Sequence, residues 1–131
     1  MNAQTTFWLE TRAGVTFPAL FLRLEAIGIA ALSIIAFGAV GGDWSTQFLW
    51  LLVPDLAMVG YLWGARVGGF SYNLTHNYAL PIILGLVGAY LGQLALLHIA
   101  LLWSAHVGID RLLGFGLKYK TGFTHTHLHL I

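Results

Sequence analysis

Four long apolar segments dominate this sequence and limit what the chain can fold into. They cover about residues 17–40, 46–64, 70–91 and 94–114, and short turns rich in glycine separate them. A helix of about 20 residues crosses the roughly 30 Å hydrocarbon core of a bilayer. The pattern predicts an all-α, polytopic membrane protein with one transmembrane domain over residues 1–131. Its four transmembrane helices should form an up-down bundle, followed by a cytoplasmic C-terminal tail over residues 116–131.

The composition agrees with a membrane location and excludes several classes of function. The chain is 58% hydrophobic and 8% charged, whereas a soluble domain is about a quarter charged. A net charge of +1 offers no basic face, so nucleic acid is not an expected partner. The expected partners are the lipid bilayer and either further copies of the chain or other subunits of a membrane complex. Because cysteine is absent, His, Asp, Glu or backbone oxygen would have to hold any metal.

The distribution of charge predicts the orientation. Basic residues cluster before the first segment, in the second loop and after the fourth segment, whereas the other two loops carry only Asp43. By the positive-inside rule both termini should be cytoplasmic in a bacterial inner membrane. The first apolar run is interrupted by Arg23 and Glu25 and lacks a clear cleavage site, so we expect a retained span rather than a signal peptide.

Glycines at four-residue spacing indicate where helices approach each other. Gly60, Gly64 and Gly68 form one such series, and Gly88 and Gly92 form another. Small residues at this spacing allow close backbone contact in lipid. The alternative is the ordinary enrichment of glycine in membrane helices.

Each predicted helix carries an ionisable residue at a similar depth. Counting about 1.5 Å per residue from the cytoplasmic ends places Glu25 roughly 10–12 Å deep, Asp55 about 13 Å and His76 about 9 Å. The same count places His106 about 12 Å and Asp110 about 6 Å deep in the fourth helix. Such groups should face the bundle interior and find partners there. We therefore predict one polar site to which all four helices contribute.

Three kinds of chemistry suit this site. His106 and Asp110 lie four apart on one helical face, and with His76 and Asp55 they offer nitrogen and oxygen ligands for Zn, Fe or Mn, with an open position. Glu25 is then a candidate general base. The second reading is an ion-pair network, in which acids pair with arginines of the same or neighbouring helices: Asp110 with Arg111 or Arg23, and Glu25 with Arg66. The third is a proton or ion pathway through the same groups.

Residues around this cluster are candidates for binding a substrate or completing the metal site. Asn73 and Tyr119 offer hydrogen bonds, and Arg111 or Lys118 could position an anionic group. In the histidine-rich tail, His127 is a further candidate ligand if the tail folds under the bundle. His98 lies toward the opposite leaflet, where a packing role is expected.

Several segments together resemble one protein family. They are LRLE (22–25), PDLAMVGY (54–61), YNLTH (72–76), AHVGIDRLLGFGLKY (105–119) and TGF with THL (121–128). This set is similar to the domain-of-unknown-function 4260 family of small bacterial membrane proteins with four predicted helices. The resemblance covers about residues 20–128 and implies shared polar positions at Glu25, Asp55, Asn73, His76, His106, Asp110, Arg111, Lys118, Tyr119 and His127.

The leading hypothesis is binding or metal-assisted chemistry on a small or lipophilic substrate at this site. The resemblance implies no particular reaction. A transporter of protons, ions or small solutes is one alternative, and a structural subunit of a membrane complex is another.

Overall fold

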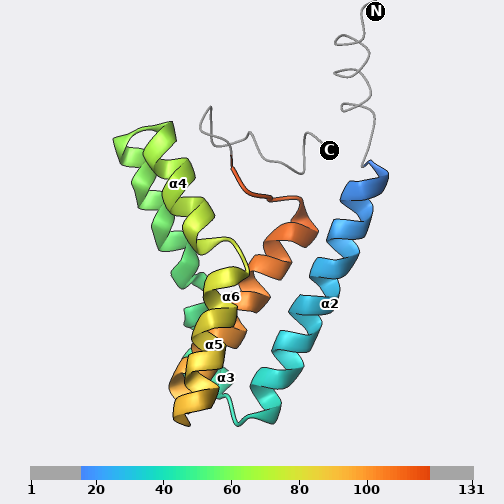
Figure 1. The fold of residues 1–131 in the computed structure, drawn as a ribbon, viewed down its shortest axis with the longest axis vertical. Helices are drawn as coiled ribbons and strands as arrows, with labels where there is room; N and C mark the ends of the chain where they lie inside the picture. Colours follow the sequence, from blue (N-terminus) through green and yellow to red (C-terminus); the bar gives the residue numbers. More distant parts are fainter. Residues whose placement is uncertain (1–15, 119–131) are drawn as a thin grey trace, which may run out of the picture.

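The computed structural model describes residues 16–118, and helices make up most of this part of the chain (Figure 1). The elements are α2 (Phe17–Ala39), α3 (Trp44–Gln47), the 3₁₀ helix η1 (Phe48–Trp63), α4 (Ala65–Thr75), α5 (Ala79–Leu91) and α6 (Leu94–Leu113). Three stretches are long and apolar enough to cross a membrane: Phe17–Ala39, Ala65–Leu91 and Leu94–Leu113. The predicted all-α class is confirmed, and these three helices support a membrane protein.

The second predicted span, residues 46–64, differs from the expected α-helix. The short α3 leads into η1, a 3₁₀ helix of 16 residues that contains Pro54. Proline has no backbone N–H and its ring clashes with the carbonyl four residues earlier in an α-helix. The turn predicted between residues 64 and 70 is also wrong, because residues 65–69 lie inside α4.

The third predicted span, residues 70–91, is divided between two helices. The chain leaves helical geometry over residues 76–78, between α4 and α5. Asn77 joins the two ends: its amide Nδ2 donates to the Asn73 carbonyl (2.7 Å), and its Oδ1 accepts from Ala79 N (2.8 Å). Pro81 lies in the first turn of α5, where a missing N–H costs little. The interruption therefore lies before Pro81 and is not caused by it.

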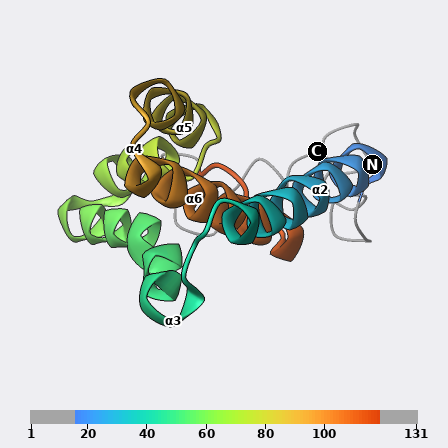
Figure 2. The ribbon, with the colours of Figure 1, turned by 90° about the horizontal axis from the view of Figure 1, so that it is seen from below.

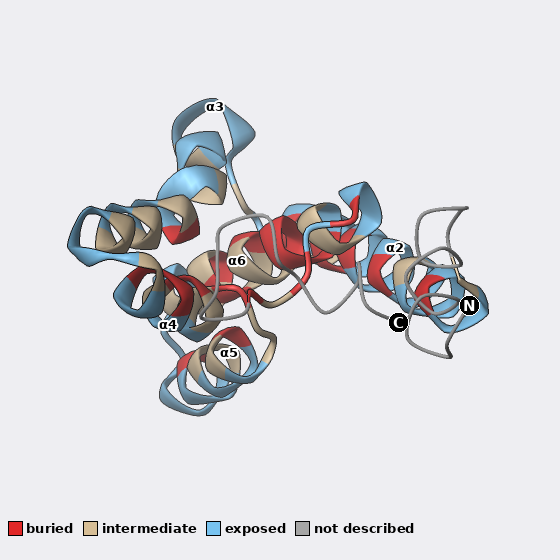
Figure 3. Ribbon diagram, turned by 90° about the horizontal axis from the view of Figure 1, so that it is seen from above, coloured by how far each residue is buried: buried red, intermediate tan, exposed pale blue. Residues whose placement is uncertain are grey.

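Helix α6 is the centre of the fold. It packs against α2, α5 and η1, and Figure 2 shows it running between α2 on one side and α4 with η1 on the other. In Figure 3 much of the buried surface follows α6. Gly108 makes the contact with α2 close, since a Cβ there would lie 2.8 Å from the Ala26 carbonyl oxygen and 2.9 Å from Ala30 Cβ.

The predicted glycine contacts also join η1 to α4 and α5 to α6. A Cβ at Gly60 would collide with Ser71, and a Cβ at Gly68 would collide with the ring of Tyr61. A Cβ at Gly88 would lie 2.9 Å from the backbone nitrogen of Leu97. The close-packing interpretation of these three glycines is confirmed. Gly92, in contrast, adopts the left-handed conformation (φ 65°) and makes the turn before α6.

A group of polar contacts lies at the end of the fold where α2 is followed by α3. His98 Nε2 donates to the Val40 carbonyl (3.1 Å), and Nδ1 accepts from the Gln47 amide (3.4 Å). Its ring packs edge-on against Phe37. Hydrogen bonds from the side chain and backbone of Ser45 hold the pKa of Asp43 below its usual value. The packing role predicted for His98 is confirmed.

Candidate metal centre

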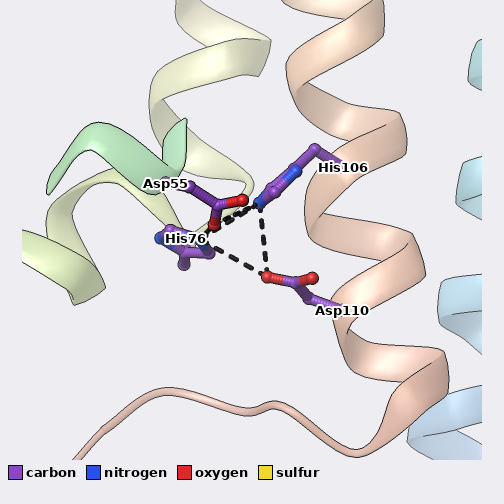
Figure 4. Close-up of side chains that lie close together, drawn as sticks. All are labelled: Asp55, His76, His106 and Asp110. Atoms are coloured by element: carbon purple, nitrogen blue, oxygen red, sulfur yellow. Dashed lines mark hydrogen bonds and ion pairs between the residues drawn. The ribbon is translucent and has the colours of Figure 1, made fainter. Parts of the chain in front are cut away.

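Four polar side chains from three elements meet in one cluster (Figure 4). Asp55 comes from the 3₁₀ helix η1, and His76 is the residue directly after α4. His106 and Asp110 lie one turn apart on α6. One ligand atom from each residue lies within 4.8 Å of the other three. We call these four residues the His/Asp cluster.

The distances within the His/Asp cluster are nearly equal. His76 Nε2 lies 3.3 Å from Asp55 Oδ1 and 3.4 Å from Asp110 Oδ2. His106 Nε2 lies 3.3 Å from each of the same two oxygens. The two Nε2 atoms are 3.1 Å apart. Five of the six edges between the donor atoms are therefore 3.1–3.4 Å long.

These edges match the dimensions of a four-coordinate metal. Zinc binds imidazole nitrogen and carboxylate oxygen at about 2.0–2.2 Å, and a regular tetrahedron has edges about 1.63 times its centre-to-corner distance. The expected donor-to-donor distance is then about 3.3–3.6 Å. The four nitrogen-to-oxygen distances of 3.3–3.4 Å fall in this range, and the 3.1 Å between the two Nε2 atoms is slightly shorter, so the cluster could hold a metal ion.

Hydrogen bonds fix the orientation of His76. Its Nδ1 lies 2.9 Å from the carbonyl oxygen of Tyr72, which can only accept, so Nδ1 carries the hydrogen. In the neutral ring Nε2 is then unprotonated and directs its lone pair at the cluster. The Tyr72 ring stacks on the imidazole with centroids 3.7 Å apart and an 8° tilt. A ligating histidine is normally held by such a bond to a carbonyl.

Further bonds hold the backbone around the two histidines. The His106 imidazole donates to the Leu51 carbonyl. Trp103 Nε1 donates to the Thr75 carbonyl (2.5 Å), and Arg111 Nη2 donates to the His76 carbonyl (3.2 Å). The donors on α6 thus fix the end of α4 in place, which sets the distance between His76 and His106.

The two histidines are buried, whereas the acids are partly open. The side chains are 2% exposed for His76 and 8% for His106, but 17% for Asp110 and 42% for Asp55. Two carboxylates facing an unprotonated imidazole nitrogen repel one another unless a proton or a cation lies between them. The donor set is therefore compatible with a bound metal ion and also with a proton on one of the imidazoles.

A cavity of about 190 Å³ adjoins the open side of the cluster. Asp55, Asp110, Met58, Tyr72, Phe115 and Lys118 line it. Since liquid water occupies about 30 Å³ per molecule, the cavity has room for roughly six waters or a small organic group.

Asn73 holds the segment after α6 against this cavity. Its Nδ2 donates to the Lys118 carbonyl (2.7 Å), and its Oδ1 accepts from Lys118 N (2.6 Å). The Lys118 ammonium lies 4.5 Å from the centre of the Tyr72 ring. Burial lowers the pKa of Lys118, although the Asp110 charge opposes this change. Asn73 therefore positions Lys118, because both polar atoms of the Asn73 side chain bond to the Lys118 backbone.

The other predicted site residues lie elsewhere. Glu25 is not part of the His/Asp cluster: it lines a separate cavity with Arg111, so the predicted convergence of all four helices is wrong for α2. Within residues 16–118 the structure records no ion pair for Glu25, and Asp110 pairs with histidines instead of arginines. Tyr119 and His127 lie outside the described residues.

Sequence reasoning missed Tyr72 and Trp103 as supports of the site. Tyr72 precedes His76 by four residues, so a shared helical face was a usable signal. Trp103 carries no such signal, because its contact with Thr75 joins two separate helices.

The fold and the site together define an all-helical protein with candidate membrane helices and a group of His and Asp residues that could hold a metal ion. The chain belongs to the family described as domain of unknown function (DUF4260), whose model matches residues 19–131. The resemblance expected from the sequence is confirmed. No curated protein and no solved structure matches the chain.

Proposed function

We propose that this chain is a membrane protein that binds a divalent metal, zinc by preference, at the His/Asp cluster. The bound metal would assist chemistry on a small or lipophilic substrate in the adjoining cavity. The observation that carries this proposal is the set of five donor-to-donor distances of 3.1–3.4 Å. Two imidazoles and two carboxylates suit zinc, with iron and manganese as the other metals compatible with this set.

The uneven burial of the ligands supports a reactive site. Metals that only stabilise a fold usually have four closed protein ligands, whereas reactive ones keep a position for water or substrate. Asp55 is the most exposed of the four residues and borders the cavity, so a metal held by the cluster would be reached from this side. A zinc ion held there would act as a Lewis acid and would lower the pKa of a water molecule bound to it. Lys118 lines the same cavity and would position an anionic group.

The course of the chain supports four membrane crossings, with η1 as the second. Figure 1 places the start of α2, the turn between η1 and α4, and the end of α6 toward one end of the molecule. At about 2.0 Å per residue, the 16 residues of η1 extend about 32 Å, enough to cross a bilayer. Arg66 and Lys118 lie toward that end, which would face the cytoplasm of a bacterial cell.

Metal analysis of the detergent-purified protein tests the proposal. We expect about one zinc per chain in the wild type and strong loss in His106→Ala, because removing a ligand leaves three donors. His98→Gln is the matched control, since His98 is also a buried histidine but lies outside the cluster. Equal metal content in His106→Ala and the wild type, or none in either after growth with zinc, iron and manganese, would refute the proposal.

Transport of the metal is a second candidate function, and the break between α4 and α5 favours it. Ion sites in transporters often lie where membrane helices are interrupted, and His76 is the first residue of this break. Zinc flux into proteoliposomes should then require Asp55. Flux that is unchanged in Asp55→Asn would reject this candidate without affecting the metal-binding proposal.

A further inference from the structure

A second cavity is lined in part by Arg111, the residue that donates to the His76 carbonyl. It measures about 270 Å³, and its lining combines α2 residues with one residue before α5 and one from α6: Leu22, Glu25, Ala26, Ile29, Tyr78 and Arg111. This volume corresponds to roughly nine waters. Its polar groups are one carboxylate, one guanidinium and one phenol, and the remaining lining is apolar.

Two of these polar groups lack a partner in the described part of the chain. The Tyr78 hydroxyl is buried and forms no hydrogen bond there. Glu25 is an exposed residue, and its carboxylate forms no hydrogen bond or ion pair among residues 16–118. A buried hydroxyl without a partner costs about 1–3 kcal/mol. A ligand that supplies the missing partners would remove this cost.

The opposite charges in the cavity specify the chemistry of that ligand. The Glu25 carboxylate attracts a cation, whereas the Arg111 guanidinium carries N–H donors in a planar fork whose geometry matches phosphate oxygens. Arg111 uses Nη2 to hold the His76 carbonyl, which keeps its guanidinium in place. A ligand with an ammonium and a phosphate a few bonds apart would contact both charges.

The position of the cavity indicates a lipid as the source of this ligand. Gly108 contacts Ala26, and Gly114 lies against Arg23, so Glu25 is level with the last turn of α6. A helix that spans a bilayer ends near the headgroups. Leu22 and Ile29, on the α2 side of the cavity, are 36% and 37% exposed, so acyl chains could extend along α2.

We propose that this cavity binds the headgroup of a zwitterionic phospholipid with a primary ammonium, such as phosphatidylethanolamine. The ammonium contacts Glu25, and the phosphate accepts hydrogen bonds from Arg111 and the Tyr78 hydroxyl. This inference does not depend on the metal, because neither Glu25 nor Tyr78 is a member of the His/Asp cluster.

Native mass spectrometry of the full-length protein from nanodiscs tests the proposal. The nanodiscs contain equal amounts of phosphatidylethanolamine and phosphatidylglycerol. We expect the wild type to retain the ethanolamine lipid about fivefold in excess, as one ion pair would give, and Glu25→Gln to retain both equally. Tyr78→Phe should reduce retention of both lipids, since it removes a donor to the phosphate. Asp43→Asn is the matched control, because it removes a carboxylate at the opposite end of the fold.

Equal retention of the two lipids by the wild type would overturn the proposal, and so would an unchanged preference in Glu25→Gln. Displacement of the lipid by soluble phosphoethanolamine at comparable concentration would identify a free metabolite instead of a lipid, and would also overturn it. Metal content measured on the same samples separates this result from the metal proposal. In excess zinc, Glu25→Gln should still contain about one metal per chain, because it keeps all four residues of the His/Asp cluster.

Discussion

Substituting Gly108 by alanine should separate α2 from α6 without disturbing the His/Asp cluster. The added Cβ would lie 2.8 Å from the Ala26 carbonyl oxygen, 2.9 Å from Ala30 Cβ and 3.1 Å from Ala30 N. Ordinary contacts to a carbon atom are about 3.5–4.0 Å. Two of the three neighbours are backbone atoms of a helix, which cannot turn aside as a flexible side chain can.

The two helices must therefore move apart by a few tenths of an ångström or more. Overpacking of this kind costs about 1–3 kcal/mol, whereas alanine gains about 0.5–1 kcal/mol over glycine in a helix interior. Gly28 on α2 supplies the reference, because a Cβ there meets nothing within 4 Å. We expect Gly108→Ala to be about 1–3 kcal/mol less stable than Gly28→Ala.

Thermal or denaturant unfolding in detergent, followed by circular dichroism, measures this difference. Metal content should remain at the wild-type level in both variants, because no residue of α2 belongs to the cluster. If Gly108→Ala is as stable as Gly28→Ala, the close contact between α2 and α6 is not present. If Gly108→Ala loses its metal while folded, the independence of the cluster from α2 is refuted.

Three further predictions concern other parts of the molecule. Asn73→Leu removes both hydrogen bonds to the Lys118 backbone, so hydrogen exchange in residues 114–118 should rise by about thirtyfold, at roughly 1 kcal/mol per bond. Zinc affinity should fall at least tenfold between pH 7.5 and 5.5, measured by chelator competition, because metal must displace protons from imidazole; an unchanged affinity would contradict histidine ligation. The folded-state pKa of Asp43 is lowered by Ser45, so its contribution to stability is present above the unfolded pKa and is lost as pH falls through the folded pKa. Acid unfolding of Asp43→Ala should accordingly depend less steeply on pH below about 4 than that of the wild type.

The histidines and aspartates of the cluster could be predicted from the sequence, because helix periodicity fixes some of their relations. His106 and Asp110 share a face at any packing arrangement that keeps α6 helical. Depth counting then brought Asp55 and His76 to the same level, and the structure places both beside them.

The prediction that Glu25 joins the cluster was wrong, because the depth of a residue does not determine which side of the helix its side chain faces. The buried positions of α2 include Ala26, Ala30, Ser33 and Phe37, which follow helical spacing and face the core. Glu25 precedes Ala26 by one residue, which turns its side chain about 100° away from that face. The depth of Glu25 along the helix was predicted correctly, but the direction of its side chain could be known only from how α2 packs on α6.

Apolar composition also could not distinguish an α-helix from a 3₁₀ helix in residues 48–63. Both conformations satisfy the backbone hydrogen-bonding groups within the segment, so both are compatible with a lipid environment. The 3₁₀ form rises about 2.0 Å per residue instead of 1.5 Å and repeats every three residues. The lateral position of Asp55 therefore depends on a conformation that hydropathy does not encode.

The placement of Arg111 connects the two proposed sites. Its guanidinium lines the Glu25 cavity, and its Nη2 holds the carbonyl of His76, whose imidazole belongs to the cluster. A phosphate in the Glu25 cavity would therefore compete for the group that fixes the end of α4. Lipid binding and metal affinity should then be coupled, and linkage requires that each changes the other by the same factor. Zinc affinity measured with and without phosphatidylethanolamine should differ in the wild type, and equal values would show that Arg111 serves the two sites independently.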